Sequence, residues 1–242
     1  IDFIATTDDP CDSLDEHAKL AADPSFTAKH RMTPTFRPDK YLEPARADWH
    51  ELLAKLADVS GIDPSTLDGF TAAMENRRAH FKARGGISVD HSHKDLESAY
   101  LDKTEADKLF AKCFAGQASV DECTLMRKHL LGDQIRMASE DGMTVTLHPA
   151  VYRNHDEDAF ATYGADVGHD IPTAVECTYA LQPMLTRYGN NPNFKIVIIV
   201  MDETTFSREV APLVGWYRSA YVGPAWCFID SPEAIMRQKR AI

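Results

Sequence analysis

Six short runs of β-branched and aromatic residues recur along this chain, and each ends in a group of charged or ring side chains. The runs lie near residues 2–6, 32–36, 86–90, 143–148, 195–201 and 222–227. The run 195–201 is almost continuously apolar, which is typical of strands buried on both faces of a parallel sheet. Because the loops after parallel strands open on one face of an α/β barrel, polar residues distant in sequence can converge there. The pattern predicts an enzyme of that architecture.

Helical stretches separate these runs. They are expected near residues 52–57, 64–84, 104–115, 119–141, 171–188, 205–219 and 231–240. A strand followed by a helix, repeated about six times, predicts a parallel sheet with right-handed crossovers. Since a closed barrel of this class has eight strands, we predict an α/β fold of the (β/α)₈ TIM type with about six βα units present and helical elaborations. Residues 1–242 are then a segment of one barrel domain that lacks the first and last strands.

The net charge and the cysteine pattern limit the kinds of partner and the cellular compartment that we expect for this chain. The formal net charge of −11 is spread along the chain without a basic stripe, which argues against nucleic acid and anionic membranes as partners. An acidic ligand must therefore be held by local arginines, which pair well with carboxylates. The five cysteines show no CxxC pair, and no apolar run is long enough to span a bilayer. Reduced thiols in the cytoplasm fit this pattern best.

Arg37 is the first candidate for such a binding site. It lies between Phe36 and Pro38, with Asp39 close behind. Pro38 disfavours a helical conformation for Arg37, so we expect its guanidinium to project from an extended turn. Two interpretations remain open: Arg37 binds a substrate carboxylate, or it pairs with Asp39 and only fastens the loop.

The segment Asp90-His91-Ser92-His93 follows the third run. Two histidines at i and i+2 on a strand point to the same side and could chelate one metal ion, although they could equally be polar loop residues. Asp90 is the better candidate for chemistry, because a carboxylate at the strand end would face the barrel mouth. Its alternative role is to cap the following turn or helix.

His148 ends the fourth run, and Arg153 follows after a short turn. A histidine there can act as a general acid or base, or bind a hydroxyl group, because its reference pKa lies near neutrality. A structural role is the alternative, and the nearby arginine favours the functional one.

Two further groups of residues have simpler explanations. Asp8 and Asp9 could supply acid and base carboxylates, but Pro10 in a first helical turn after an aspartate cap would explain them structurally. Trp226 and its neighbours fit a pocket wall, where rings can cover apolar sugar faces. No Gly-rich phosphate loop, GxSxG or HExxH motif is found.

Taken in order, these motifs resemble the uronate isomerase (glucuronate isomerase) family of the amidohydrolase superfamily. The resemblance extends over nearly the whole chain. It is carried by Thr7-Asp8-Asp9-Pro10, Asp12-Ser13-Leu14, His17, Phe36-Arg37-Pro38-Asp39-Lys40, Asp90-His91, Leu147-His148, Arg153-Asn154 and Trp226-Cys227-Phe228.

The resemblance implies a cytoplasmic isomerase that interconverts aldose and ketose sugar acids: D-glucuronate with D-fructuronate, and D-galacturonate with D-tagaturonate. It implies a metal-bearing (β/α)₈ barrel whose divalent ion, expected to be zinc, has its ligands outside this chain. Small-molecule sugar acids are the expected partners, and a homo-oligomer is compatible with the resemblance. The family pattern places Asp90 and His148 among the catalytic groups, and Arg37, Arg153, Arg208 and Trp226 among the substrate-binding groups.

The expected reaction moves a proton between C1 and C2 through an enediol, with a carboxylate as the base and a metal or arginine at the developing oxyanion. Two alternatives stay open. One is a metal-dependent hydrolase of the amidohydrolase type, and the other is a barrel that binds sugar acids without catalysis.

Overall fold

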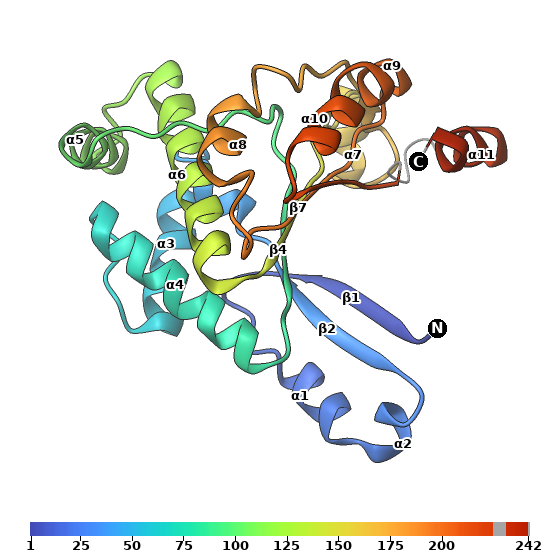
Figure 1. Cartoon of the computed structure of the whole chain (residues 1–242). Helices are drawn as coiled ribbons and strands as arrows, with labels where there is room; N and C mark the ends of the chain where they lie inside the picture. The colour runs from blue at the N-terminus through green and yellow to red at the C-terminus, as the bar shows by residue number, and fades with distance from the viewer. Residues whose placement is uncertain (225–230, 242) are drawn as a thin grey trace. The chain divides into compact units, whose positions relative to one another are not determined.

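The computed structural model describes residues 1–224 and 231–241, in which helices alternate with short strands (Figure 1). This part of the chain forms two compact units. The first comprises Ile1–Asp90 and Ser98–Val145, and the second comprises His91–Glu97 and the residues from Thr146 onward. Strands β3 (Ser88–His91) and β4 (Thr144–Leu147) begin in the first unit and end in the second.

The first unit is built on neighbouring strands in the order β1, β2, β3, β4. β1 (Phe3–Asp8) and β2 (Arg31–Phe36) are parallel, and β2 is parallel to β3. Pairing of β1 with β2 places Asp8 opposite Phe36, so the polar residues that follow both strands emerge at the same end. Parallel strands need long connections, which the helices supply.

Helices account for most of the remaining first unit, and Figure 1 shows α4 and α6 running beside each other. Trp49 and Phe110 are buried, and their rings meet edge to face with centroids 5.7 Å apart. Burying such large rings is worth several kcal/mol, on the order of 25 cal/mol per Å² of apolar surface. The helices of this unit are α1 (Asp15–Ala22), α2 (Pro24–Thr27), the 3₁₀ turn η1 (Asp39–Leu42), α3 (Trp49–Ser60), α4 (Leu67–Ala83), α5 (Lys103–Phe114) and α6 (Val120–Asp141).

Local capping explains why α4 and α6 begin and end close to the predicted positions. Thr66 accepts a hydrogen bond from the Gly69 N–H at the start of α4. Ser119 and Glu122 form a capping box at the start of α6, which satisfies two backbone donors that the helix cannot pair itself. Gly142 ends α6 in the left-handed conformation, at φ 75°, which a glycine adopts without steric cost. The prediction of a helix over 119–141 is confirmed.

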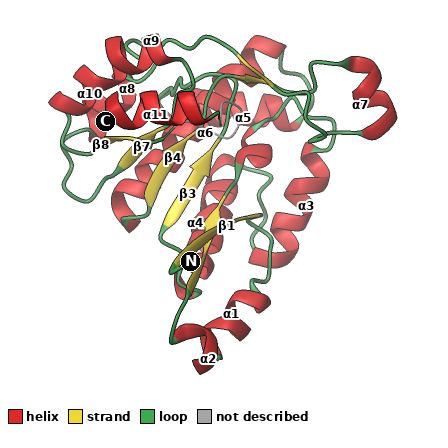
Figure 2. Cartoon of the chain, turned by 90° about the vertical axis from the view of Figure 1, so that its right-hand side faces the viewer, coloured by secondary structure: helices red, strands yellow, loops and turns green. Residues whose placement is uncertain are grey.

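The second unit contains the last residues of β3 and β4 together with β7 (Ile196–Ile198) and β8 (Ala220–Val222). β7 and β8 are parallel neighbours, visible in Figure 2. A short antiparallel hairpin is formed by β5 (Val151–Tyr152) and β6 (Ile171–Pro172). The helices are α7 (Glu157–Tyr163), α8 (Gln182–Tyr188), α9 (Glu203–Thr205), the π-helical turn η2 (Phe206–Val210), α10 (Ala211–Trp216) and α11 (Pro232–Ala241).

The predicted α/β class and the order of six βα units are confirmed. β1, β2, β3, β4, β7 and β8 lie near the six predicted runs, and a helix follows each of them, as in TIM-type folds. No helix within 1–224 or 231–241 is long and apolar enough to cross a membrane.

Two local predictions are wrong. The helix expected over 171–188 is only α8, because Pro183 is tolerated in a first helical turn and not in a helix interior. Pro10 lies in a turn outside any helix, and the next helix begins at Asp15, so Asp9 does not cap a helix that starts at Pro10.

Candidate functional site

Arg37 lies between two carboxylates of the first unit. It follows the last residue of β2, and its backbone N–H donates to the Asp8 carbonyl across the β1–β2 edge. Its Nε lies 3.0 Å from Asp39 Oδ2, and its Nη1 lies 3.5 Å from Asp90 Oδ2. Asp90 is buried near the end of β3. The sequence-predicted residues Arg37 and Asp90 are therefore brought together.

The geometry supports the pairing of Arg37 with Asp39, while its binding of a substrate carboxylate stays a prediction. The ion pair with Asp39 holds the loop, as the structural alternative requires. The contact with Asp90 places a guanidinium beside a buried carboxylate. A carboxylate is a group that can transfer a proton, and a guanidinium is one that can stabilise a developing negative charge.

Both carboxylate oxygens of Asp9 are bound by neighbouring protein groups, which favours a structural role over an acid–base role. Its Oδ1 accepts hydrogen bonds from the Tyr41 hydroxyl, at 2.7 Å, and from the Cys11 N–H, at 2.9 Å, while Lys40 pairs with Oδ2. Burial disfavours the charged form of Asp9, but Lys40 and these donors outweigh it and lower the pKa of the carboxyl group. Burial also raises the pKa of Tyr41. The structural role weighed for this aspartate is the one its contacts favour, although it does not act as the helix cap.

The second unit holds three of the histidines noted in the sequence. His91 and His93 are buried, and their rings stack with centroids 5.9 Å apart and planes 20° from parallel. The His148 N–H donates to the His91 carbonyl at 2.7 Å, which continues the β3–β4 pairing past the end of β4. Neutral imidazole is a good ligand for zinc and similar ions, so His91 and His93 are the groups of this unit that could hold a metal.

A cleft of about 300 Å³ opens next to His93 in the same unit. One wall is the segment after β3, with Ser92, His93 and Lys94, and the other is the β5–β6 hairpin. Arg153, which directly follows β5, lines the cleft as well. Two cations and an imidazole therefore line this cleft, and the described residues of its lining include no carboxylate.

Arg153 is oriented by Asp170, which lies just before β6. The Arg153 Nη1 donates to Asp170 Oδ2, and the Asn154 N–H donates to Oδ1 of the same carboxylate at 2.8 Å. Burial opposes the charge of Asp170, but these two donors outweigh it and hold the pKa of the carboxyl group below its usual range. The sequence analysis did not identify Lys94 or Asp170. Lys94 could have been noted because it follows the His-Ser-His segment, whereas nothing in the local pattern links Asp170 to Arg153.

The last two predicted site residues, Arg208 and Trp226, are not among the described residues that line the cleft at Arg153. Arg208 is 62% exposed and pairs with the adjacent Glu209, whose carboxylate also accepts the Cys177 and Thr178 N–H groups. Arg208 is not among the residues that line the cleft at His93 and Arg153. Trp226 lies outside the described residues.

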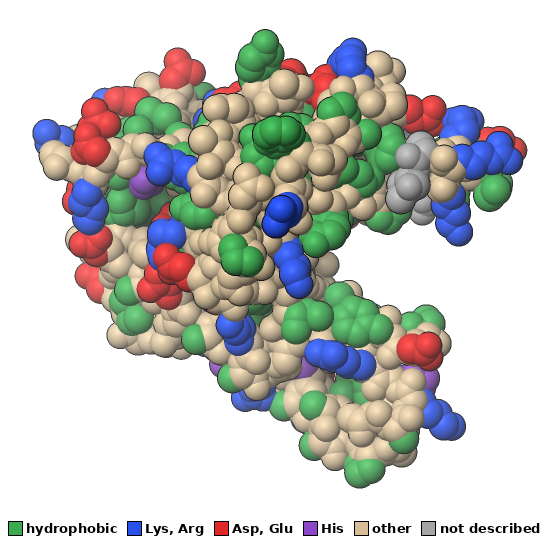
Figure 3. Space-filling view, in the orientation of Figure 1, with side chains coloured by type: hydrophobic (Ala, Val, Ile, Leu, Met, Phe, Trp, Pro, Cys, Tyr) green, Lys and Arg blue, Asp and Glu red, His purple; other side chains and the backbone are tan. Residues whose placement is uncertain are grey.

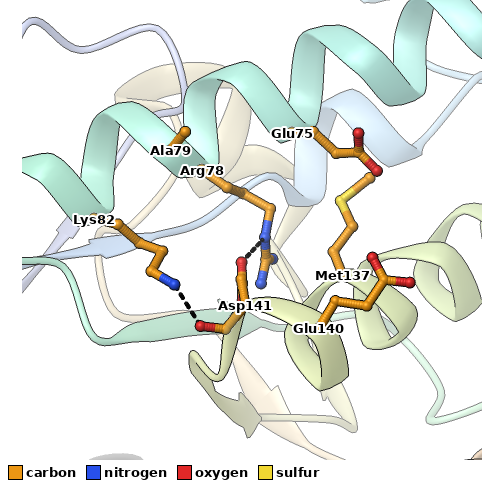
Figure 4. A pocket seen from close by; sticks show the side chains of 7 residues that line it. All are labelled: Glu75, Arg78, Ala79, Lys82, Met137, Glu140 and Asp141. Carbon is orange, nitrogen blue, oxygen red and sulfur yellow. Dashed lines mark hydrogen bonds and ion pairs between the residues drawn. The ribbon is translucent and has the colours of Figure 1, made fainter.

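A second cleft, of about 370 Å³, separates α4 from α6 in the first unit (Figure 4). Arg78 from α4 pairs with Asp141 from α6, with 2.8 Å between Nε and Oδ2, and Lys82 donates to the Asp141 carbonyl. Glu75 and Glu140 line the same cleft. Three carboxylates there would repel an acidic ligand, so we interpret these contacts as a structural tie between the two helices.

The surface charge agrees with the composition. On the face shown in Figure 3, acidic and basic side chains lie interspersed, and no broad basic surface gathers among the described residues drawn there. On this face an anionic ligand would meet no broad positive field, and local cations would have to supply its binding.

Comparison with known proteins adds a family match over the whole chain. A model of the glucuronate isomerase family matches residues 1–242. The uronate isomerase of Cutibacterium acnes is 57% identical over 242 residues, which are 100% of this chain and 51% of that protein. The uronate isomerase of Corynebacterium efficiens is 41% identical over 237 residues, 98% of this chain and 50% of that protein. The chain thus spans about half the length of these curated relatives.

Solved structures agree with the fold. The glucuronate isomerase from Caulobacter crescentus superposes with a TM-score of 0.93 at 34% identity, covering 100% of this chain and 50% of that one. The uronate isomerase from Thermotoga maritima gives a TM-score of 0.91 at 29% identity, covering 100% and 53%. The arrangement of helices and strands is therefore shared with both proteins over the full length of this chain.

Proposed function

Because this chain belongs to the glucuronate isomerase family, we propose that it forms part of an enzyme that interconverts aldose and ketose sugar acids. The substrates we propose are D-glucuronate and D-galacturonate, with D-fructuronate and D-tagaturonate as their products. We place the reaction in the cytoplasm, and we propose free sugar acids as its partners, with neither nucleic acid nor membrane involved.

The observation that carries this proposal is the cleft lined by His93, Lys94 and Arg153, with no carboxylate among the described residues of its lining. A uronate differs from a neutral hexose in its carboxylate group. Arginine binds carboxylates in a planar, charge-assisted fork, and such hydrogen bonds are about twice as strong as neutral ones. A cleft of about 300 Å³ lies at the lower end of the range for small-molecule sites.

We assign the chemistry to the residues near β3 and β4. Asp90 is the proposed acid–base carboxylate that moves a proton between C1 and C2, and Arg37, whose Nη1 lies 3.5 Å from Asp90 Oδ2, is proposed as a substrate-binding guanidinium beside it. His148 is the proposed polar group that holds a substrate hydroxyl. Arg153 is the proposed guanidinium for the carboxylate, Arg208 is proposed to bind another part of the substrate, and Trp226 is proposed to cover an apolar sugar face.

We further propose a divalent metal, zinc in the first instance. The resemblance places the ligands outside this chain, whereas the stacked, buried rings of His91 and His93 have donor chemistry that suits such an ion, so we propose that these two histidines could contribute to holding it. When bound, the metal would supply Lewis-acid stabilisation of the developing oxyanion. The residues of this chain would bind and orient the sugar acid and move its proton.

The chain matches only about half the length of its relatives, which concerns how much of the barrel it contains. Because the relatives are about twice as long as this chain, we propose that residues 1–242 are a segment of one (β/α)₈ barrel domain whose first and last strands lie outside it. The intact protein is accordingly the molecule to test, and its oligomeric state, with a homo-oligomer as one outcome, is to be measured with it.

The decisive assay follows glucuronate and galacturonate conversion by the intact protein, with and without a chelator. We expect turnover that the chelator abolishes and that added zinc restores. Solvent deuterium should appear at the carbon that receives the proton, whereas complete retention of substrate label would indicate a hydride shift. Hydrolysis of uronolactones without isomerisation, or binding without turnover, would overturn the proposal in favour of a hydrolase or a non-catalytic binder.

A further inference from the structure

The cleft at Arg153 differs in charge from other clefts of this protein. Its described lining contains Lys94 and Arg153 and no acid. Each of three other clefts in the described part has at least one carboxylate, among them Asp63, Glu122 and Asp141. In a chain with 37 acidic and 26 basic residues, an acid-free lining with two cations is the less expected composition. It suits an anionic group.

Asp170 holds Arg153, one of the two cations of this cleft, through both of its carboxylate oxygens. One carboxylate oxygen accepts from the Arg153 guanidinium, and the other accepts from the backbone N–H of the next residue, Asn154. Asn154 has a left-handed conformation, at φ 55°, which few residue types adopt without a compensating contact. The Arg153 guanidinium and the backbone N–H of the residue that follows it are thus both bound to one buried carboxylate.

Asp166 provides an internal contrast. It lies 3.7 Å from the same Nη1 of Arg153, but its side chain is 83% exposed, whereas that of Asp170 is 4% exposed. An ion pair with so exposed a partner does little to fix the geometry, because water competes for both charges. A buried aspartate with two donors holds its partner in one orientation.

We propose that this cleft is the subsite for the substrate carboxylate, with Lys94 as a second cation that determines specificity and Asp170 as a positioning residue that holds Arg153 toward it. The inference rests on the proposed function and names which group of the sugar acid the cleft takes. Asp170 does not touch the substrate; it acts through Arg153. Neutral aldoses, which carry a hydroxymethyl group in place of the carboxylate, should bind poorly.

The test uses the intact protein and a matched pair of variants, Asp170→Asn and Asp166→Asn. Both remove one negative charge near Arg153, so any difference between them reports position rather than charge. We expect Asp170→Asn to raise the KM for glucuronate about tenfold, the size of one charge-assisted hydrogen bond, with kcat changed by less than about threefold. Asp166→Asn should leave both constants within about twofold. Equal effects of the two variants would overturn the positioning role.

A double-mutant cycle separates positioning from a general structural effect. If Asp170 acts through Arg153, then Asp170→Asn should raise KM no further in a protein that already carries Arg153→Ala. Additive effects would show that Asp170 acts by another route. Thermal melts of each variant, with and without glucuronate, show whether a loss of binding accompanies unfolding, and Asp170→Glu, which keeps the charge, should recover part of the affinity.

Lys94→Gln tests the second cation. We expect the KM for glucuronate to rise about threefold to tenfold and to become less sensitive to salt, while any weak binding of glucose stays unchanged. An equal loss of affinity for glucuronate and glucose would overturn the specificity role of Lys94.

Titration calorimetry and turnover assays of the wild type with glucuronate distinguish the failure of the proposed function from the failure of the subsite assignment. If the wild type neither binds nor converts glucuronate, the proposed function fails. If it does both and the variants behave like the wild type, only the subsite assignment fails.

Discussion

The ion pairs Arg78–Asp141 and Arg153–Asp170 have the same chemistry in different settings. Arg78 is 2% exposed and lies between α4 and α6, where it also donates to Gln134. Arg153 is 38% exposed and lines a cleft, although its partner Asp170 is buried. The first pair has a buried cation and lies among further carboxylates, so we assign it a stabilising role. The second has a buried anchor and an accessible cation, which is how a protein presents a charge to a ligand.

The cleft linings reinforce this difference. The α4–α6 cleft has Glu75, Glu140 and Asp141 in its lining, as Figure 4 shows, whereas the described lining residues at Arg153 include no acid. An arginine alone therefore does not predict anion binding; the surrounding carboxylates decide it. Substitutions at the two arginines should separate stability from binding.

The largest expected effect is on stability, in Arg78→Ala. Removing the guanidinium leaves Asp141 and Gln134 without their partner at a largely buried site, which typically costs about 3–5 kcal/mol in the free energy of unfolding. Urea unfolding of the intact protein measures it. Glu75→Gln, at the exposed rim of the same cleft, is the control and should change the free energy by less than about 1 kcal/mol. A similar small loss in both variants would contradict the structural assignment.

The next effect is on binding, in Arg153→Ala. We expect the KM for glucuronate to rise about 100-fold, equivalent to about 2.7 kcal/mol, because charge-assisted hydrogen bonds to the substrate are lost. The free energy of unfolding should fall by less than in Arg78→Ala. Arg237→Ala, which removes an exposed arginine paired with Glu203, is the control and should leave KM unchanged. Unchanged KM in Arg153→Ala would remove the contrast between the two pairs.

Arg37 combines features of both pairs, because it contacts the loop residue Asp39 and the buried Asp90. We expect Arg37→Ala to lower kcat/KM about tenfold, through the loss of the Asp90 contact, and to lower stability by about 1 kcal/mol. Asp39→Asn is the matched control, since it removes the loop contact and keeps the one to Asp90. If Asp39→Asn reproduces the full loss of activity, Arg37 serves mainly to hold the loop.

The sequence predicts the fold better than the site, for a physical reason. Strands and helices such as β2 and α6 follow from local patterns: β-branched runs, the Ser119 cap and Gly142. The β5–β6 hairpin was missed because each strand has only two residues, too few for a period to show.

Site partners depend on contacts that no local pattern encodes. The Arg37–Asp39 pair was foreseen because the two residues are neighbours in sequence. Asp170 was missed because it reaches Arg153 across a hairpin, 17 residues away. Lys94 was missed because it shares a cleft with Arg153 only once the segment after β3 and the hairpin form its two walls. Burial, which distinguishes Asp170 from Asp166, is likewise a property of the folded chain.

The smallest expected effect is the pH dependence that Asp170 contributes to stability. Its two donors lower the pKa of the carboxyl group in the folded protein, so its charged form stabilises the fold. This contribution is fully present above the ordinary aspartate pKa of about 3.9 and is lost as the pH falls through the lower, folded value. Because the partner Arg153 is partly open to solvent, which screens the pair, we expect this contribution to be smaller than the effects above.

Urea unfolding of the wild type and Asp170→Asn at pH 6, 4 and 3 measures this contribution. The difference in unfolding free energy between the two proteins should be largest at pH 6 and should shrink toward pH 3, while other carboxylates with lowered pKa values, such as Asp9 and Glu209, cancel in the comparison. Asp166→Asn should show only a small difference, because its exposed side chain pairs weakly in the folded protein. If the difference in unfolding free energy between the wild type and Asp170→Asn stays constant across this pH range, the two donors do not stabilise the charged form of Asp170. Asp170 would then not be the buried anchor that distinguishes Arg153 from a surface arginine.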